Sequence, residues 1–132
     1  MQKQRIEHPI ETGDFRGMSP AVRVGNQLYI SGQGPLDLRD KSVLSGTIEE
    51  ETLITLSYIK DLVIQAGGSL ENIVKCTAYL ADLEDFNGYH KTYVDFFQDV
   101  SIAPARTTVQ ANLLRGIRVE IDAIAVLPID TQ

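Results

Sequence analysis

Two residues of opposite charge near the C-terminal end of the chain have side chains suited to catalysis, Arg106 and Glu120. The planar guanidinium of an arginine binds a carboxylate through two parallel hydrogen bonds. A glutamate in a semi-enclosed cleft can accept a proton from an attacking water or deliver one to a leaving group. Spacing alone does not require this chemistry, because a solvated strand face also explains Glu120 beside Arg118 and Asp122.

The segments that carry these residues have the pattern of two β-strands. Residues 105–111 are rich in Thr and Val and follow Pro104, while residues 117–127 alternate between apolar and mostly polar side chains. Between them, residues 113–116 (LLRG) end in a glycine that can take positive φ, which predicts a hairpin connection. We therefore expect Arg106 and Glu120 on neighbouring strands.

The rest of the chain predicts a further hairpin, a strand and two helices. Residues 1 to about 20 form an irregular arm with room for a short strand, and residues 21–24 and 27–31 flank the turn-forming pair Gly25-Asn26. A capping box at residues 47–50 (TIEE) starts a helix that ends at Gly67. Its predicted apolar stripe is Leu53, Leu56, Ile59, Val63 and Ala66. A strand over residues 73–80 precedes a second helix, with Asp82 as its cap and an aromatic stripe through residues 86–97.

This order of elements indicates the α+β class, in a single domain over residues 1–132. Both helices should pack on one face of a mixed sheet, because the crossovers share one hand. The opposite face then carries Ile124 and Val126 among charged residues, so self-association is plausible.

Composition excludes several classes of partner. Eighteen acidic residues against twelve basic ones give a net charge of −6, which would repel a nucleic acid. No apolar run reaches the length of a membrane span and no hydrophobic signal core follows the first residues, so no membrane association and a cytoplasmic location are expected.

Metal and thiol chemistry are poorly supported as well. With only His8 and His90 as imidazoles and no ligand spacing around them, no metal site is predicted. Cys76 lies inside a predicted strand, where a buried and inert thiol is expected. No glycine loop has the residues of a phosphate-binding loop, so no cofactor is expected.

Six segments of the chain resemble the YjgF/RidA family, in family order and over nearly the whole length. They are residues 24–33 (VGNQLYISGQ), 66–70 (AGGSL), 74–80 (VKCTAYL), 93–97 (YVDFF), 104–110 (PARTTVQ) and 119–126 (VEIDAIAV). The resemblance implies a chorismate mutase-like (YjgF) fold in a homotrimer with a ligand cleft at each subunit boundary. It also implies a cofactor-free hydrolase of reactive 2-imino and 2-enamino acids, similar to 2-iminobutanoate/2-iminopropanoate deaminases, in metabolite damage control.

The same resemblance assigns roles to particular residues. Arg106 matches the arginine that binds the substrate carboxylate, and Glu120 matches the glutamate that positions water. Ser31 and Gly32 match residues that line the cleft, where the Gly32 amide can donate to the substrate.

Three ligand-contacting positions depart from the family pattern, and they leave the substrate open. Met18 stands where the family has tyrosine, His90 where it has asparagine and Thr108 where it has cysteine. His90 also fits a core histidine on the aromatic stripe. Two alternatives therefore remain: a dedicated deaminase of a larger enamine, such as an aminomuconate-like intermediate, and a regulatory protein that binds ketoacids without turnover.

Overall fold

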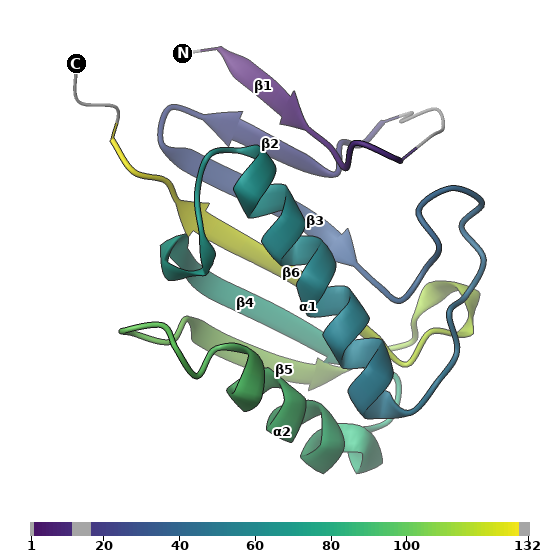
Figure 1. Ribbon diagram of the computed structural model, residues 1–132. Coiled ribbons are helices and arrows are strands. Elements are labelled where there is room, and N and C mark those ends of the chain that lie inside the picture. Colours follow the sequence, from purple (N-terminus) through teal and green to yellow (C-terminus); the bar gives the residue numbers. More distant parts are fainter. Residues whose placement is uncertain (1, 12–16, 130–132) are drawn as a thin grey trace.

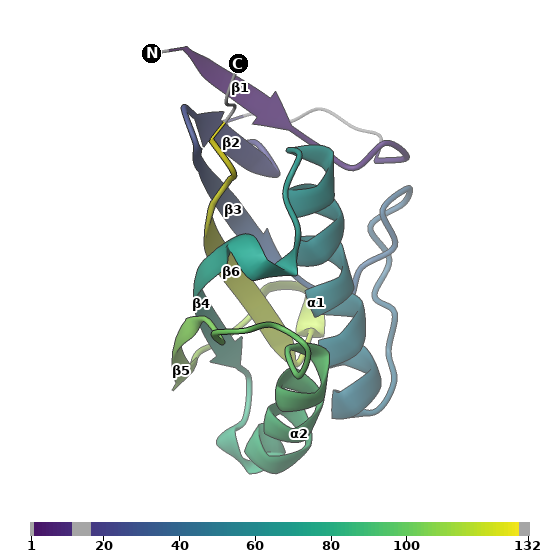
Figure 2. The same cartoon turned by 60° about the vertical axis from the view of Figure 1, so that its left-hand side comes forward.

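The fold is a six-stranded mixed sheet with two helices on one face (Figures 1 and 2). The computed structural model describes residues 2–11 and 17–129. The strands are β1 (Lys3–Ile6), β2 (Ala21–Val24), β3 (Gln27–Gln33), β4 (Ile73–Leu80), β5 (Ala105–Gln110) and β6 (Val119–Val126). The helices are α1 (Ile48–Gln65) and α2 (Phe86–Phe96), with short 3₁₀ turns η1 (Leu70–Asn72), η2 (Leu83–Asp85) and η3 (Leu114–Gly116).

The strand order β1-β2-β3-β6-β4-β5 confirms the mixed sheet but corrects one neighbour relation. β5 and β6 are not adjacent, because β4 lies between them, parallel to β5 and antiparallel to β6. The predicted hairpin at residues 113–116 is therefore wrong.

The connection instead crosses the end of β4. The amide of Ala111 donates to the carbonyl of Leu80, and the amide of Ala81 donates to the carbonyl of Arg118. Within this connection Arg115 has φ of 64° and Gly116 has φ of 75°. A buried central strand needs a hydrogen-bonded neighbour on both sides, and this path supplies both to β4.

The core lies between the sheet and the two helices, as the alternation in β6 predicts. The side chains of Val119, Ile121, Ala123 and Ala125 are buried there. In α1 the capping box at Thr47 and Glu50 is present, and the predicted apolar stripe is buried except for Leu53, which is 49% exposed. Thr52 and Thr55 are buried in its place, and the Thr55 hydroxyl is satisfied by donating to the carbonyl of Glu51 at 2.8 Å.

Two further features fix the elements that lead into the candidate site. Asp82 caps η2, so α2 begins only at Phe86. The carboxylate of Glu51, which is buried, accepts from the backbone amide and from Nε of Arg118, both at 3.2 Å. This ion pair ties α1 to Arg118, which lies directly before β6 and two positions before Glu120. Within the described part of the chain, no helix is long and apolar enough to cross a membrane.

Candidate active site

A pocket of about 450 Å³ opens beside Arg106, between the start of β5 and α2. A volume of this size is typical of sites for small molecules. Its lining is mostly aromatic and apolar, with Arg106 and His90 as its basic members: His90, Tyr93, Val94, Phe97, Gln98, Ala103, Pro104 and Arg106.

The guanidinium of Arg106 is held by α2. One terminal nitrogen lies 3.1 Å from Nδ1 of His90. Because arginine has no acceptor atom, Nδ1 of His90 is the acceptor and the ring hydrogen lies on Nε2. The guanidinium carbon also lies 4.7 Å from the ring centre of Tyr93 and 5.5 Å from that of Tyr89, within the range of cation–π contacts.

Arg106 has no carboxylate partner among the described residues, in contrast to Lys41 and Arg118, which form ion pairs. A guanidinium that is half-buried, fixed in orientation and not neutralised can bind an anion that enters the pocket.

His90 lies at the pocket and is not only a packing residue. Its ring stacks on Phe86, with centroids 5.3 Å apart and planes at 12°, while Nδ1 faces Arg106. The aromatic stripe thus supplies the ring contacts and leaves the polar edge of His90 directed at the arginine.

Thr108 and Cys76 lie on the same helix-facing side of the sheet as Arg106. Thr108 Oγ1 is 2.8 Å from the hydroxyl of Tyr89. Cys76 pairs with Arg106 in the sheet register and is buried, and this burial raises the pKa of its thiol to about 11. The thiol therefore stays protonated at neutral pH, which agrees with the predicted inert cysteine.

Glu120 lies on the opposite face of the sheet. It pairs with Tyr79 in the register of β4 and β6, whereas the neighbouring pair of Ala78 and Ile121 faces the core. Burial, with a smaller contribution from the charge of Asp122, raises the pKa of Glu120 above its ordinary value. Asp122 itself accepts a hydrogen bond from the hydroxyl of Tyr79 at 2.9 Å.

Gly32 provides a backbone surface against which Glu120 packs. The register of β3 and β6 shifts between Ile30 and Gln33, so Ser31 and Gly32 form a bulge. A Cβ atom at Gly32 would lie 2.3 Å from Oε2 of Glu120, so only glycine leaves room for the carboxylate here. The strand does not end at Ser31, since β3 continues to Gln33.

The segment before β2 lies against this bulge. The hydroxyl of Ser31 donates to the carbonyl of Ser19 at 2.6 Å, and its amide donates to the carbonyl of Pro20 at 2.9 Å. Met18, the residue before Ser19, is 51% exposed, so its side chain does not belong to the core.

The predicted site residues thus fall into two groups within one chain. The arginine group (Arg106, His90 and Thr108) lies between β5 and α2. The glutamate group (Met18, Ser31, Gly32 and Glu120) lies around the bulge of β3 and on the opposite face of the sheet. Glu120 on β6 is two strand spacings, or about 10 Å, from β5, and it lies on the other face of the sheet from Arg106. One chain alone does not bring Arg106 and Glu120 together.

Sequence reasoning gave no role in the site to Tyr89 and Tyr93, whose rings hold Arg106, or to Tyr79, which holds Asp122. Both α2 tyrosines were expected only in the core. The alternation of side chains in β5 is the sequence signal for these contacts, because it places Arg106 and Thr108 on one side of the strand. If that side faces α2, both residues must meet its aromatic stripe.

Comparison with known proteins assigns this chain to a family. A family described as endoribonuclease L-PSP matches residues 14–127. A protein named 2-iminobutanoate/2-iminopropanoate deaminase from Mus musculus is 41% identical over 109 residues, covering 82% of this chain and 79% of its own. A RutC family protein from Pyrococcus abyssi is 36% identical over 108 residues, covering 81% and 84%.

Solved structures agree with this assignment. The YjgF gene product from E. coli superposes with a TM-score of 0.84 at 29% identity, over 93% of this chain and 98% of that chain. The E. coli protein TdcF with bound serine superposes with a TM-score of 0.85 at 28% identity, over 95% and 99%. The chain therefore belongs to the YjgF/RidA family, as the sequence motifs predict.

Proposed function

We propose that the protein is a cofactor-free deaminase that hydrolyses 2-imino and 2-enamino acids to 2-keto acids and ammonia. The observation that carries this proposal is Arg106, a fixed guanidinium in a pocket with no carboxylate partner among the described residues. Relatives at about 40% identity that are named imine deaminases support it.

Each group supplies one part of the reaction. Arg106 binds the carboxylate of the substrate, which places the carbon–nitrogen double bond beside it. Glu120, with its raised pKa, accepts a proton from the attacking water and returns one to the departing ammonia. The Gly32 amide donates to the substrate carboxylate, and His90, Thr108 and Met18 contact the rest of the molecule.

This chemistry requires the arginine group of one copy and the glutamate group of another. We propose a homotrimer in which each cleft lies at a boundary between two subunits. The face of the sheet opposite the helices supports this assembly, because it carries partly exposed apolar side chains that include Tyr29, Val109 and Val126. In a closed ring of three copies all boundaries are the same, so each boundary combines one arginine group with one glutamate group in a complete cleft.

A larger substrate is the second candidate. The pocket beside Arg106 is lined by Tyr93, Phe97 and Pro104 and leaves room beyond what a three- or four-carbon imino acid fills. Met18 adds an adaptable apolar side chain from the glutamate group. Both features favour enamines or imines with apolar side chains.

Nuclease activity, which the description of the matched family names, is disfavoured by charge. Eighteen acidic residues against twelve basic ones give the chain a net charge of −6. Binding to the phosphates of a nucleic acid is favoured by an excess of basic residues instead.

Hydrolysis of imines made in the assay tests the proposal. An amino-acid oxidase generates the 2-imino acid, and semicarbazide traps the fraction that survives. The protein should lower the trapped product in proportion to its concentration, for alanine-derived and leucine-derived imines alike. A purified protein that binds 2-keto acids but leaves trapping unchanged would instead be a regulator.

A further inference from the structure

His8 is a buried histidine outside both groups of the site. Its side chain comes from the segment after β1 and is 2% exposed. Burying an imidazole requires a hydrogen-bond partner, because an unpaired polar group in the interior is costly. His8 finds that partner in β3.

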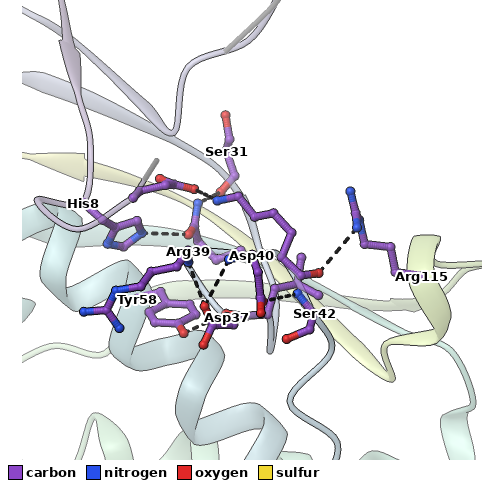
Figure 3. Close-up of polar contacts among 12 residues, drawn as sticks. His8, Ser31, Asp37, Arg39, Asp40, Ser42, Tyr58 and Arg115 are labelled. Atoms are coloured by element: carbon purple, nitrogen blue, oxygen red, sulfur yellow. Dashed lines mark hydrogen bonds and ion pairs between the residues drawn. The ribbon is translucent and has the colours of Figure 1, made fainter. Parts of the chain in front are cut away.

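The hydrogen bonds of His8 lead directly to the bulge of β3. Nε2 of His8 lies 3.1 Å from Oε1 of Gln33, and Nε2 of Gln33 donates to the carbonyl of Ser31 at 3.0 Å. Because the amide nitrogen of Gln33 is already directed at Ser31, its oxygen accepts from His8. Figure 3 shows this chain of dashed lines running from His8 to Ser31.

The position of the His8 ring is fixed from a second direction by α1. Tyr58 meets it edge to face, with centroids 5.3 Å apart and planes at 63° (Figure 3). The Tyr58 hydroxyl donates to the carbonyl of Leu36 at 2.8 Å, so only its ring contacts His8. The imidazole is thus a rigid donor aimed at Gln33.

What this donor holds is the backbone next to Gly32. A bulge residue lacks regular ladder partners, so its carbonyl needs another hydrogen bond to keep one geometry. Gly32 is the surface that Glu120 packs against, where even a Cβ atom would reach within 2.3 Å of the carboxylate. A small shift at Ser31 therefore changes the surroundings of Glu120.

We propose that His8, acting through Gln33, is a positioning residue that holds the Ser31–Gly32 bulge against Glu120. The role rests on the proposed function of Glu120. It gives this chain a link from its N-terminal segment to the candidate catalytic carboxylate.

The test compares three variants of the full-length protein. His8→Phe keeps a ring against Tyr58 but loses the donor, and Gln33→Met loses both hydrogen bonds at similar side-chain length. Tyr58→Phe is the matched control, since it also removes one hydrogen bond beside His8 but leaves the link to Ser31 intact. His8→Gln restores a donor.

The decisive reading is the pH titration of the Glu120 carboxyl carbon by NMR, assigned with Glu120→Gln. In His8→Phe and Gln33→Met the midpoint should fall toward that of an ordinary glutamate, because a loosened bulge admits water to the carboxylate. The kcat for imine hydrolysis should fall about tenfold with little change in KM, since a misplaced catalytic group costs rate. Tyr58→Phe should change neither, and His8→Gln should recover both.

An unchanged Glu120 midpoint in folded His8→Phe and Gln33→Met would overturn the proposal, as would an equal shift in Tyr58→Phe. Should His8→Phe fail to fold, Gln33→Met decides the question by itself. A wild-type protein without imine hydrolysis would refute the proposed function, whereas the titration would still decide the positioning role.

Discussion

Arg106 is the residue on which the proposed chemistry depends most. Its guanidinium touches His90 and the rings of Tyr89 and Tyr93, so its position is set before a substrate arrives. Preorganised donors of this kind need little rearrangement during a reaction. The hydroxyls of Thr108 and Tyr89, which lie nearby, hydrogen-bond to each other.

Removing Arg106 should abolish most of the activity and leave the fold intact. Losing a charged hydrogen bond to a desolvated partner costs about 2 to 5 kcal/mol, so Arg106→Ala should lower kcat/KM by at least about 30-fold. Arg106→Lys should recover only part, because an ammonium lacks the planar fork. Arg23→Ala, which removes the arginine that donates to Ala66 at the end of α1, is the control and should keep wild-type turnover. Equal activity in Arg106→Ala and Arg23→Ala would refute the assignment.

The charge of Asp122 should tune the pH at which Glu120 works. A general base is active above its pKa, and burial and Asp122 hold the pKa of Glu120 above 4.5. Activity should therefore fall as the pH drops through that raised value. Asp122→Asn removes the repulsion, so the pKa of Glu120 should decrease and the acid limb of kcat should move to lower pH. Asp95→Asn, at an exposed position of α2, removes an equal charge and should leave the limb unchanged. A limb that does not move in Asp122→Asn would mean that Glu120 does not control it.

At the scale of elements, the bulge of β3 is the feature that lets a carboxylate lie against the backbone. Gly32→Ala should displace Glu120 while the strand stays in place, because the atom that would clash is the end of a flexible side chain. We expect kcat to fall about tenfold or more, since small displacements of catalytic groups are costly. The thermal midpoint should stay close to that of the wild type. A variant with wild-type kcat would show that Glu120 does not need this contact.

The elements themselves were largely predictable, whereas their neighbours in the sheet were not. The capping box at Thr47, the alternation in β6 and the turn at Gly25 are local signals, and each element appears where they place it. The insertion of β4 between β5 and β6 is a nonlocal fact, because residues 111–118 could equally have formed a hairpin. For the same reason the prediction of Arg106 and Glu120 on neighbouring strands is wrong, because β4 lies between the two strands that carry them.

Burial in α1 shows a second limit of local patterns. Leu53 fits the apolar stripe but is half exposed, while Thr52 and Thr55 are fully buried. A threonine can enter a helix-facing core when its hydroxyl bonds to a carbonyl one turn earlier, as Thr55 does with Glu51. Hydrophobicity alone does not reveal that option.

For the whole molecule, the two faces of the sheet have different roles. The helices cover one face, and the other presents Glu120 and Asp122 beside partly exposed Tyr29, Val109 and Val126. In the proposed homotrimer this second face meets another copy. Light scattering of a dilute solution should then give three times the chain mass of 14.6 kDa. A monomer that hydrolyses imines at nanomolar concentration would contradict the shared cleft.

The most direct test of a cleft shared between copies is to mix two inactive variants. Arg106→Ala keeps the glutamate group and Glu120→Gln keeps the arginine group, so each supplies what the other lacks. Equal amounts, unfolded and refolded together, should form hybrid oligomers in which about one quarter of the boundaries combine both intact groups. Imine hydrolysis in the mixture should then reach about one quarter of the wild-type rate, well above that of either variant refolded alone. Activity no higher than that of the separate variants, in a sample whose hybrid oligomers are verified by native mass spectrometry, would rule out a shared cleft.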